Sequence, residues 1–502
     1  MNSSTRIILR DLGRVLHVPG LMALASLPIC YLFQEYYAIW PFVWTALIAL
    51  VVGQLLYRVF QCSDEAYLDQ AMVIAALSWI CVSLLGALPF MLIAANLTEQ
   101  PQVSQTVQAF RQPWNALFES FSGFTATGLT VALDPSALPR SLQWWRSFTE
   151  WIGGAGIIVL ILSVVGSTSG IFRLYFSEAR TDRLAPSVSS TVRTIWWIYL
   201  LFTILGVLLL RLTGVPWWEA LNHGMTGIAT GGFDITGTSV ARYDERSRAV
   251  VILVMILGAI SFSVHYHVLV RRQIPNLWRD AQQRVFWVFL LLGPLVLALE
   301  NFWFERAFLW SDSAFQWVSA LTTAGFSTTD ERAWSTTTQL LLSLAMIIGG
   351  AAGSTASGIK LNRVMYLYKG MVWRIQRILL PPHQLMRYQV GDKSLSEEDA
   401  NNQVESAGVL VILWLAMLGL GVFIMLHMLP AQVPLSEVIF EMASAQSNVG
   451  LSVGITGPDL HWSGKLVLIL FMYMGRLEIV PVFILGFALL RRMGIMAQPT
   501  SR

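Results

Sequence analysis

A short segment recurs four times along the chain, and this repeat constrains the fold more than any other feature of the sequence. The four copies are NALFESFSGFTATGL (115–129), EALNHGMTGIATGGF (219–233), DSAFQWVSALTTAGF (312–326) and EVIFEMASAQSNVGL (437–451). Aligned without gaps, they share one glycine: Gly128, Gly232, Gly325 and Gly450. A second glycine follows each of these by 25 or 26 residues: Gly154, Gly258, Gly350 and Gly475. We interpret the pattern as four consecutive structural units.

The composition places these units in a membrane. Of the 502 residues, 55% are apolar and 13% are charged, whereas a soluble protein averages about 25% charged residues. Several segments reach the roughly 20 apolar residues that a membrane-spanning helix needs. Their approximate limits are 16–34, 38–60, 70–97, 142–165, 192–213, 247–270, 284–306, 336–352 with its continuation, 405–430 and 464–490. This pattern excludes a soluble multidomain enzyme and predicts an all-α polytopic membrane protein.

The spans and the repeated segments together predict an architecture. We expect two N-terminal spans followed by four span–pore loop–span repeats, with pseudo-fourfold symmetry around one pore. The repeated segments are too short to cross a bilayer, which favours re-entrant pore loops. The expected boundaries are 1–63 for the N-terminal pair of helices and 64–170, 171–282, 283–380 and 381–502 for the four repeats.

Basic residues indicate the orientation in the membrane. They gather in the N-terminal tail and in connections on one side, which the positive-inside rule makes the cytoplasm. The clusters are Arg6, Arg10 and Arg14; Arg173, Arg180 and Arg183; Arg271, Arg272, Arg279 and Arg284; Arg363, Lys369, Arg374, Arg377 and Arg387; and Arg491 and Arg492. We therefore expect a multi-pass protein of the cell inner membrane, in contact with lipid, with both termini cytoplasmic. The polar stretch 382–402 is expected to be a cytoplasmic loop, and the net charge of +3 does not point to a nucleic-acid partner.

The end of each repeated segment is suited to line a path for cations. Irregular backbone is tolerated at membrane depth where it faces water, and rings of backbone carbonyls can replace the hydration shell of a monovalent cation. Glycine adopts the positive φ that inward-pointing carbonyls require. The predicted filter strips are Thr125, Ala126, Thr127 and Gly128; Ala229, Thr230, Gly231 and Gly232; Thr322, Thr323, Ala324 and Gly325; and Ser447, Asn448, Val449 and Gly450. No strip contains a carboxylate, which argues against a divalent-cation site; the alternative is that small residues only allow close helix packing.

Three further strings carry a family resemblance: EWIGGAGIIVL (150–160), IGGAAGSTASGIK (348–360) and MGRLEI (474–479). With the four loops and the two extra N-terminal spans, they make the chain similar over essentially its whole length to the Trk/Ktr/HKT superfamily of potassium transporters, and within it to the TrkH-like bacterial subunits. The resemblance implies a potassium-permeable pore in each protomer, a homodimer, and a cytosolic nucleotide-binding (TrkA-like) regulatory partner. It also implies that four filter glycines accompany potassium selectivity. In plant members a Ser in the first loop accompanies sodium preference, and Gly128 here departs from that.

The second span of the third repeat is interrupted by GGAAGSTASGIK (349–360). Ten of these twelve residues are Gly, Ala, Ser or Thr, which form a continuous helix poorly. The resemblance implies an intramembrane loop that blocks or clears the pore. The predicted gate residues are Gly349, Gly350, Gly353, Ser354, Thr355, Gly358, Lys360 and Arg476.

Arg476 stands one residue after the in-span glycine of the fourth repeat. A charge at the centre of a bilayer costs at least about 2.5–3.5 kcal/mol, so this side chain should face the pore or a partner. We expect a positive barrier under the filter; the alternative is a structural ion pair with Glu119, Glu150 or Glu441. Glu119 and Glu441 also share one position in two pore helices, where they could attract cations or accept hydrogen bonds from nearby loop amides.

The sequence therefore favours potassium uptake, with K⁺ as the transported ion and no organic cofactor in this chain. The alternative within the superfamily is a sodium-permeable or cation-coupled symporter. An intramembrane enzyme is disfavoured because the chain has no HExxH motif, and a transporter with inverted repeats because the four loops lie on one side. The stretches 171–190, 271–283 and 361–402 are expected to dock the regulatory partner.

Overall fold

The computed structural model describes residues 3–62, 64, 66–97, 103–156, 188–305, 309–381, 384 and 386–492. Helices dominate these residues, as predicted for a polytopic membrane protein. Six of the described helices are long and apolar enough to cross a membrane, or eight if each of two bent helix pairs counts as one span. The basic cluster at 173–183 and most of the stretch 157–190 lie outside the described residues.

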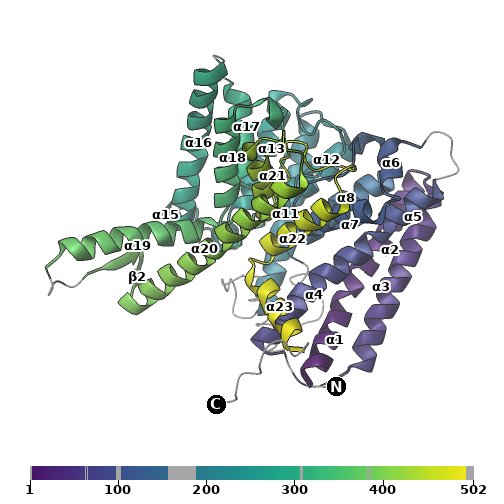
Figure 1. Cartoon of the computed structure of the whole chain (residues 1–502), viewed down its shortest axis with the longest axis horizontal. Helices are drawn as coiled ribbons and strands as arrows, with labels where there is room; N and C mark the ends of the chain where they lie inside the picture. Colours follow the sequence, from purple (N-terminus) through teal and green to yellow (C-terminus); the bar gives the residue numbers. More distant parts are fainter. Residues whose placement is uncertain are drawn as a thin grey trace.

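The N-terminal spans lie at one edge of the molecule, where Figure 1 shows them in purple. Helices α1 (Ser3–Val15) and α2 (His17–Leu32) together form one 30-residue apolar segment, which begins well before the expected limit at residue 16. A short 3-10 turn (Tyr36–Ala38) leads into α3 (Ile39–Val59), which packs against both. The pair joins the rest of the chain where α1 contacts α4 and α2 contacts α8.

Each expected repeat supplies a first span, a short buried helix and a second helix, and the second helix breaks in the second, third and fourth repeats. The first spans are α4 (Leu68–Gly86) with α5 (Leu88–Asn96), α11 (Val188–Leu212), α16 (Ala281–Glu305) and α20 (Glu397–Met428). The short helices, here called pore helices, are α7 (Pro113–Phe124), α12 (Trp217–Ile228), α17 (Trp310–Leu321) and α21 (Leu435–Ser447). The second helices begin with α8 (Arg140–Ala155), α13 (Glu245–Ala259), α18 (Thr336–Ile348) and α22 (Trp462–Arg476). Minor elements are α6 (Gln105–Ala109), α15 (Asn276–Arg279) and the 3-10 turns Pro135–Ala137 and Glu331–Ala333.

The pore helices and second helices alternate in a closed circuit. Each pore helix packs against the second helix of its own repeat and against that of the repeat before it. The circuit runs α7, α8, α12, α13, α17, α18, α21, α22 and back to α7. One chain therefore surrounds a common centre with four short helices whose C-terminal ends carry the predicted strips.

The expectation of continuous spans at 247–270 and 464–490 is wrong. Helix α13 is followed by α14 (Phe262–Leu269) at 101°, and α22 is followed by α23 (Val480–Arg492) at 114°. The third repeat is broken as expected, between α18 and α19 (Leu361–Leu379). Both bends come directly after a glycine that presses on the end of a pore helix: Gly258 on Ile228, and Gly475 on Gln446. Hydropathy continues through a bend, so the apolar pattern could not reveal it.

The stretch 382–402 is not only a loop, contrary to expectation. It contains an antiparallel hairpin of β1 (Tyr388–Val390) and β2 (Lys393–Leu395). It also contains the start of α20, where the Ser396 hydroxyl caps the helix by accepting the N–H of Asp399. In Figure 1 the hairpin lies between α19 and α20, which extend away from the helix circuit.

Candidate ion-conducting site

All four predicted strips have the same backbone conformation. In each, the second residue and the glycine at the fourth position have positive φ: Ala126 and Gly128, Thr230 and Gly232, Thr323 and Gly325, and Asn448 and Gly450. The second and third residues donate backbone hydrogen bonds to the last turn of the pore helix, as in a Schellman cap. For the third residue these bonds are Thr127 to Ser122, Gly231 to Thr226, Ala324 to Ser319 and Val449 to Ser444, each 2.9–3.0 Å. The cap ends the helix and turns the strip back along it.

The four glycines lie against one another in a ring. A methyl group added to Gly128 would approach the carbonyl oxygen of Gly231 to less than 3.0 Å, a separation that real Cβ atoms essentially never show. The same holds for Gly232 against Ala324, for Gly325 against Val449 and for Gly450 against Thr127, which closes the ring. Since each glycine meets the third carbonyl of the next strip, both the positive φ and the lack of a Cβ are needed at all four positions.

Side chains also join neighbouring strips. Asn448 donates its Nδ2 to the Thr127 hydroxyl at 2.8 Å and to the Met472 carbonyl at 2.8 Å. The hydroxyls of Thr125 and Thr127 lie 2.7 Å apart. The predicted strip residues are thus brought together, and those of the first and fourth repeats are bonded directly to each other.

One buried polar position in the pore helices supports the outer end of each strip. Nine residues before the four glycines stand Glu119, His223, Gln316 and Glu441, all buried. Their partners lie on the segments that follow the strips: Thr130 and Val131 for Glu119, Tyr243 for His223, Ser327, Thr329 and Glu331 for Gln316, and Ser452, Val453 and Thr456 for Glu441. The sequence indicated only the two glutamates, because His and Gln differ from them in type.

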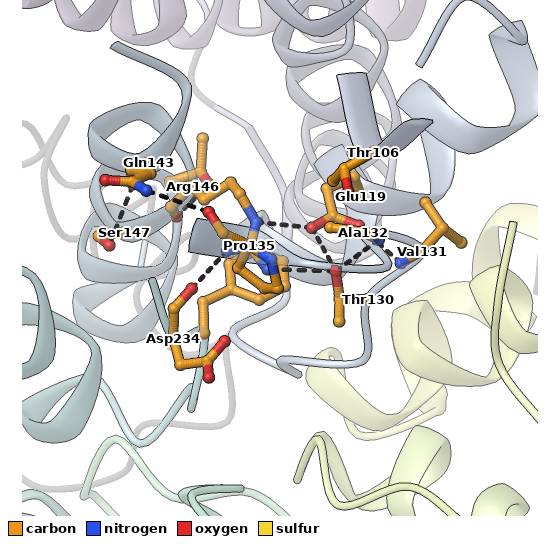
Figure 2. A network of polar contacts seen from close by, with 12 residues as sticks. Thr106, Glu119, Thr130, Val131, Ala132, Pro135, Gln143, Arg146, Ser147 and Asp234 are labelled. Atoms are coloured by element: carbon orange, nitrogen blue, oxygen red, sulfur yellow. Dashed lines mark hydrogen bonds and ion pairs between the residues drawn. The ribbon is translucent and has the colours of Figure 1, made fainter. Parts of the chain in front are cut away.

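Two charged residues of α8 form part of this support and were missed as site residues. Arg146 donates to Glu119, to Thr130 and to the carbonyl of Asp234, as Figure 2 shows. Glu150 accepts the N–H of Phe233 at 3.0 Å, beside the second strip. Two opposite charges one turn apart in an otherwise apolar span were the available signal, since such residues are costly in a membrane.

The predicted gate loop, 349–360, lies against the ends of two pore helices. The Thr355 hydroxyl donates to the carbonyls of Ile228 at 3.0 Å and Gly258 at 2.8 Å. The N–H of Ser357 donates to the hydroxyl of the strip residue Thr323 at 3.0 Å. The end of the loop returns to the end of α18, because the N–H of Lys360 donates to the carbonyl of Ile348 at 3.0 Å. The loop is therefore a compact segment that lies directly behind the second and third strips.

Arg476 reaches from α22 to this loop and to the first repeat. Its guanidinium donates to the carbonyl of Thr355 at 3.3 Å and to the carbonyls of Gly153 at 2.5 Å and Gly154 at 3.0 Å. It also lies 5.6 Å from the ring centre of Trp79. The three carboxylates considered above as its partners are bonded elsewhere: Glu119 to Arg146, Glu150 to Phe233 and Glu441 to the 452–456 segment.

A second charged group joins the gate loop to the bend of the fourth repeat. Glu478 forms ion pairs with Lys360 at 2.6 Å and with Arg363. Lys360, Glu478 and Ile479 all have positive φ, which is unfavourable for side chains of this size. The ion pairs therefore hold two strained turns against each other. Between the loop, Trp79 and Arg476 remains a cavity of about 30 Å³.

The comparisons with known proteins agree over nearly the full length. The family model for TrkH cation transport proteins matches residues 41–492. The chain is 32% identical to an uncharacterized cation transporter of Methanocaldococcus jannaschii, over 95% of this chain and 94% of that protein. It is 31% identical to the Trk system potassium uptake protein TrkH of Vibrio parahaemolyticus, over 96% of this chain and 98% of the relative.

A solved structure has the same fold. The crystal structure of the potassium transporter TrkH from Vibrio parahaemolyticus superposes with a TM-score of 0.81 at 26% identity, covering 96% of this chain and 98% of that one. With the match to the family model, this resemblance is decisive. The chain belongs to the TrkH family of cation transport proteins, which are membrane transporters and not enzymes.

Proposed function

We propose that this protein is the membrane subunit of a Trk-type system and takes up potassium through the ring of four strips. The observation that carries the proposal is the closed contact of the four glycines, each at positive φ and each against the carbonyl of the next strip. Relatives that cover nearly the whole chain are potassium uptake proteins of Trk systems. The strips 125–128, 229–232, 322–325 and 447–450 are the proposed filter, with pseudo-fourfold symmetry around one pore.

The chemistry of the strips suits a weakly held monovalent cation. A K⁺ ion gives up its hydration shell to carbonyl oxygens, and hydroxyl and carbonyl groups supply these without a formal charge. A divalent ion is held instead by carboxylates, which the strips lack. The four pore helices aim their C-terminal ends at the ring, and the partial negative charge of these ends favours cations.

The loop 349–360 and Arg476 form the proposed gate, in a closed conformation. The cavity of about 30 Å³ behind the strips has room for two or three water molecules, since a single water needs roughly 10–15 Å³ of such space. A hydrated cation does not fit. Arg476 adds a positive charge beside this space while it bonds to the loop, so opening requires both to move.

The remaining parts of the proposal concern the assembly. We propose from the family resemblance and the basic clusters that the chain has the expected repeats, forms a homodimer and works with a TrkA-like regulatory partner. On the same grounds we propose that it lies in the inner membrane with both termini cytoplasmic. A sodium-permeable or cation-coupled transporter of the same superfamily is the second candidate. The absence of acidic residues from the strips does not distinguish a potassium-selective protein from this second candidate. The flux experiment below distinguishes them.

Cation flux into liposomes tests the proposal. Purified protein is reconstituted, and uptake is measured with potassium, rubidium or sodium gradients, for the wild type and for Arg476→Ala. We expect potassium and rubidium flux well above sodium flux in Arg476→Ala at least. Equal sodium flux would overturn potassium selectivity. If neither protein gave measurable cation flux, although size-exclusion chromatography showed folded protein, the proposal of a conducting pore would be overturned.

A further inference from the structure

The first and fourth pore helices carry a glutamate at the same position, but the two glutamates have different partners. Glu441 accepts from neutral groups of its own repeat, the Ser452 hydroxyl and the N–H groups of Val453 and Thr456. Glu119 accepts from the guanidinium of Arg146, with 2.7 Å between Oε1 and Nε. Both side chains of this ion pair are completely buried, at 0% exposure.

Arg146 connects two strips rather than one. Besides Glu119, it donates to the Thr130 hydroxyl at 3.1 Å, two residues after the first strip. It also donates to the carbonyl of Asp234 at 2.6 Å, two residues after the second strip. Figure 2 shows the side chain between these two segments, and its guanidinium lies 4.1 Å from the ring centre of Phe233.

The planar guanidinium is well suited to this task. It donates in several fixed directions at once, whereas the ammonium of a lysine is a single point of charge. One turn further along α8, Glu150 accepts the N–H of Phe233 and lies against the backbone of Gly231. The same face of α8 thus fixes the outer end of the second strip at two points. The carboxylate of Asp234 accepts the N–H of Ser239 and also interacts electrostatically with Arg146.

We infer that Arg146 is a positioning residue for the filter, which sets the separation of the first two strips, and that Glu119 cancels its charge. The inference rests on the proposed function, because it assigns selectivity to the spacing of the strips. A buried cation beside the outer ends of two strips would repel entering cations if it were not neutralised. The pair therefore has two separable effects, one on geometry and one on charge.

Four variants separate these effects: Glu119→Gln, Arg146→Lys, the neutral double variant Glu119→Gln with Arg146→Gln, and the matched control Glu441→Gln. Each is made in whichever background conducts in liposomes, wild type or Arg476→Ala. Two quantities are measured, the half-saturating potassium concentration and the ratio of potassium to sodium flux. Size-exclusion chromatography gives the amount of folded protein.

Glu119→Gln should raise the half-saturating concentration by about tenfold, because the guanidinium loses the carboxylate paired with it and keeps only the more indirect attraction of Glu150 and Asp234. Glu441→Gln should raise it by a smaller factor, because the partners of this carboxylate are neutral. Arg146→Lys should lower the flux ratio by about tenfold with little change in half-saturation, since the charge stays and the bridge is lost. The double variant should recover half-saturation and keep the lowered ratio. Should Arg146→Lys not fold, the double variant carries the same comparison.

Equal shifts in Glu119→Gln and Glu441→Gln would overturn the charge effect. An unchanged flux ratio in both Arg146→Lys and the double variant would overturn the positioning effect. These failures would be seen against a selective parent protein. Failure of the proposed function would instead be seen in the parent, as a lack of potassium preference.

Discussion

The four strips share the same pattern of positive φ and the same helix caps, whereas the described chain behind them differs among the repeats. In front, the same two positions of each strip have positive φ, and the glycines meet in a ring. Behind, α13 and α22 are followed by bends and the third repeat inserts a loop. The residue after the in-span glycine is Arg476 in the fourth repeat and alanine in the other three. If the ring is the filter proposed above, a cation there would be coordinated by all four strips, and all four would have to fit it. The proposed gate would need only one moving segment, so one repeat could supply it.

The largest expected effect comes from breaking the ring. In Gly232→Ala the methyl group would collide with the carbonyl of Ala324, at a φ of +79° that alanine resists. Potassium flux should fall by at least about a hundredfold, or the ratio of potassium flux to sodium flux should fall to about one. Gly457→Ala is the control, since its methyl group would meet nothing within 4 Å. Full selective flux in Gly232→Ala would contradict the ring as the filter.

Removal of Arg476 from the proposed gate should raise potassium flux. Arg476→Ala loses the bonds to Thr355, Gly153 and Gly154 and a positive charge, so flux without any partner protein should rise by about tenfold. Arg211→Ala, at the exposed end of α11, serves as the control. The measurement is potassium uptake into liposomes. A flux equal to that of the wild type would remove Arg476 from the gate.

A smaller effect is expected from the gate loop itself. Thr355→Val keeps the shape of the side chain but loses the hydroxyl that bonds to Ile228 and Gly258. Loosening the loop should raise flux about threefold to fivefold, whereas Thr355→Ser should resemble the wild type. Potassium uptake into liposomes is measured for both variants and the wild type. If the serine variant rose as much as the valine variant, the hydroxyl would not be holding the loop.

The smallest effect is expected at the bend of the fourth repeat. Glu478→Gln removes the charge that pairs with Lys360 and Arg363 and releases two strained turns. Flux should change by about twofold, and the melting temperature should fall, because two partly buried cations lose their partner. Thermal unfolding followed by size-exclusion chromatography measures the second quantity. An unchanged melting temperature would show that the ion pairs contribute nothing to stability.

Much of this architecture could be predicted from the sequence, because the signals are local. Apolar length indicated the spans, and a glycine column at regular spacing indicated the pore loops. The bends after Gly258 and Gly475 could not be predicted, since they depend on contact with a pore helix far away in the chain. Hydropathy records the environment of a residue but not the direction of its helix.

The supporting contacts around the strips were harder still to predict. His223 and Gln316 occupy the position of Glu119 and Glu441 in the alignment of the four segments. Because their side chains differ in chemistry, the sequence does not reveal that the four positions are equivalent. The bridge made by Arg146 joins residues 88 positions apart in the chain, from Arg146 to Asp234. A pattern within one repeat cannot reveal a bond between two repeats.

The origin of the whole ring in a single polypeptide has a consequence for its evolution. In a pore made of identical subunits, one codon change alters every wall at once, so most changes are severe. Here a codon change alters one strip, and the second residues of the strips, Ala126, Thr230, Thr323 and Asn448, are of three different types. If the ring is the proposed filter, a mutation could change one strip and leave the other three unaltered.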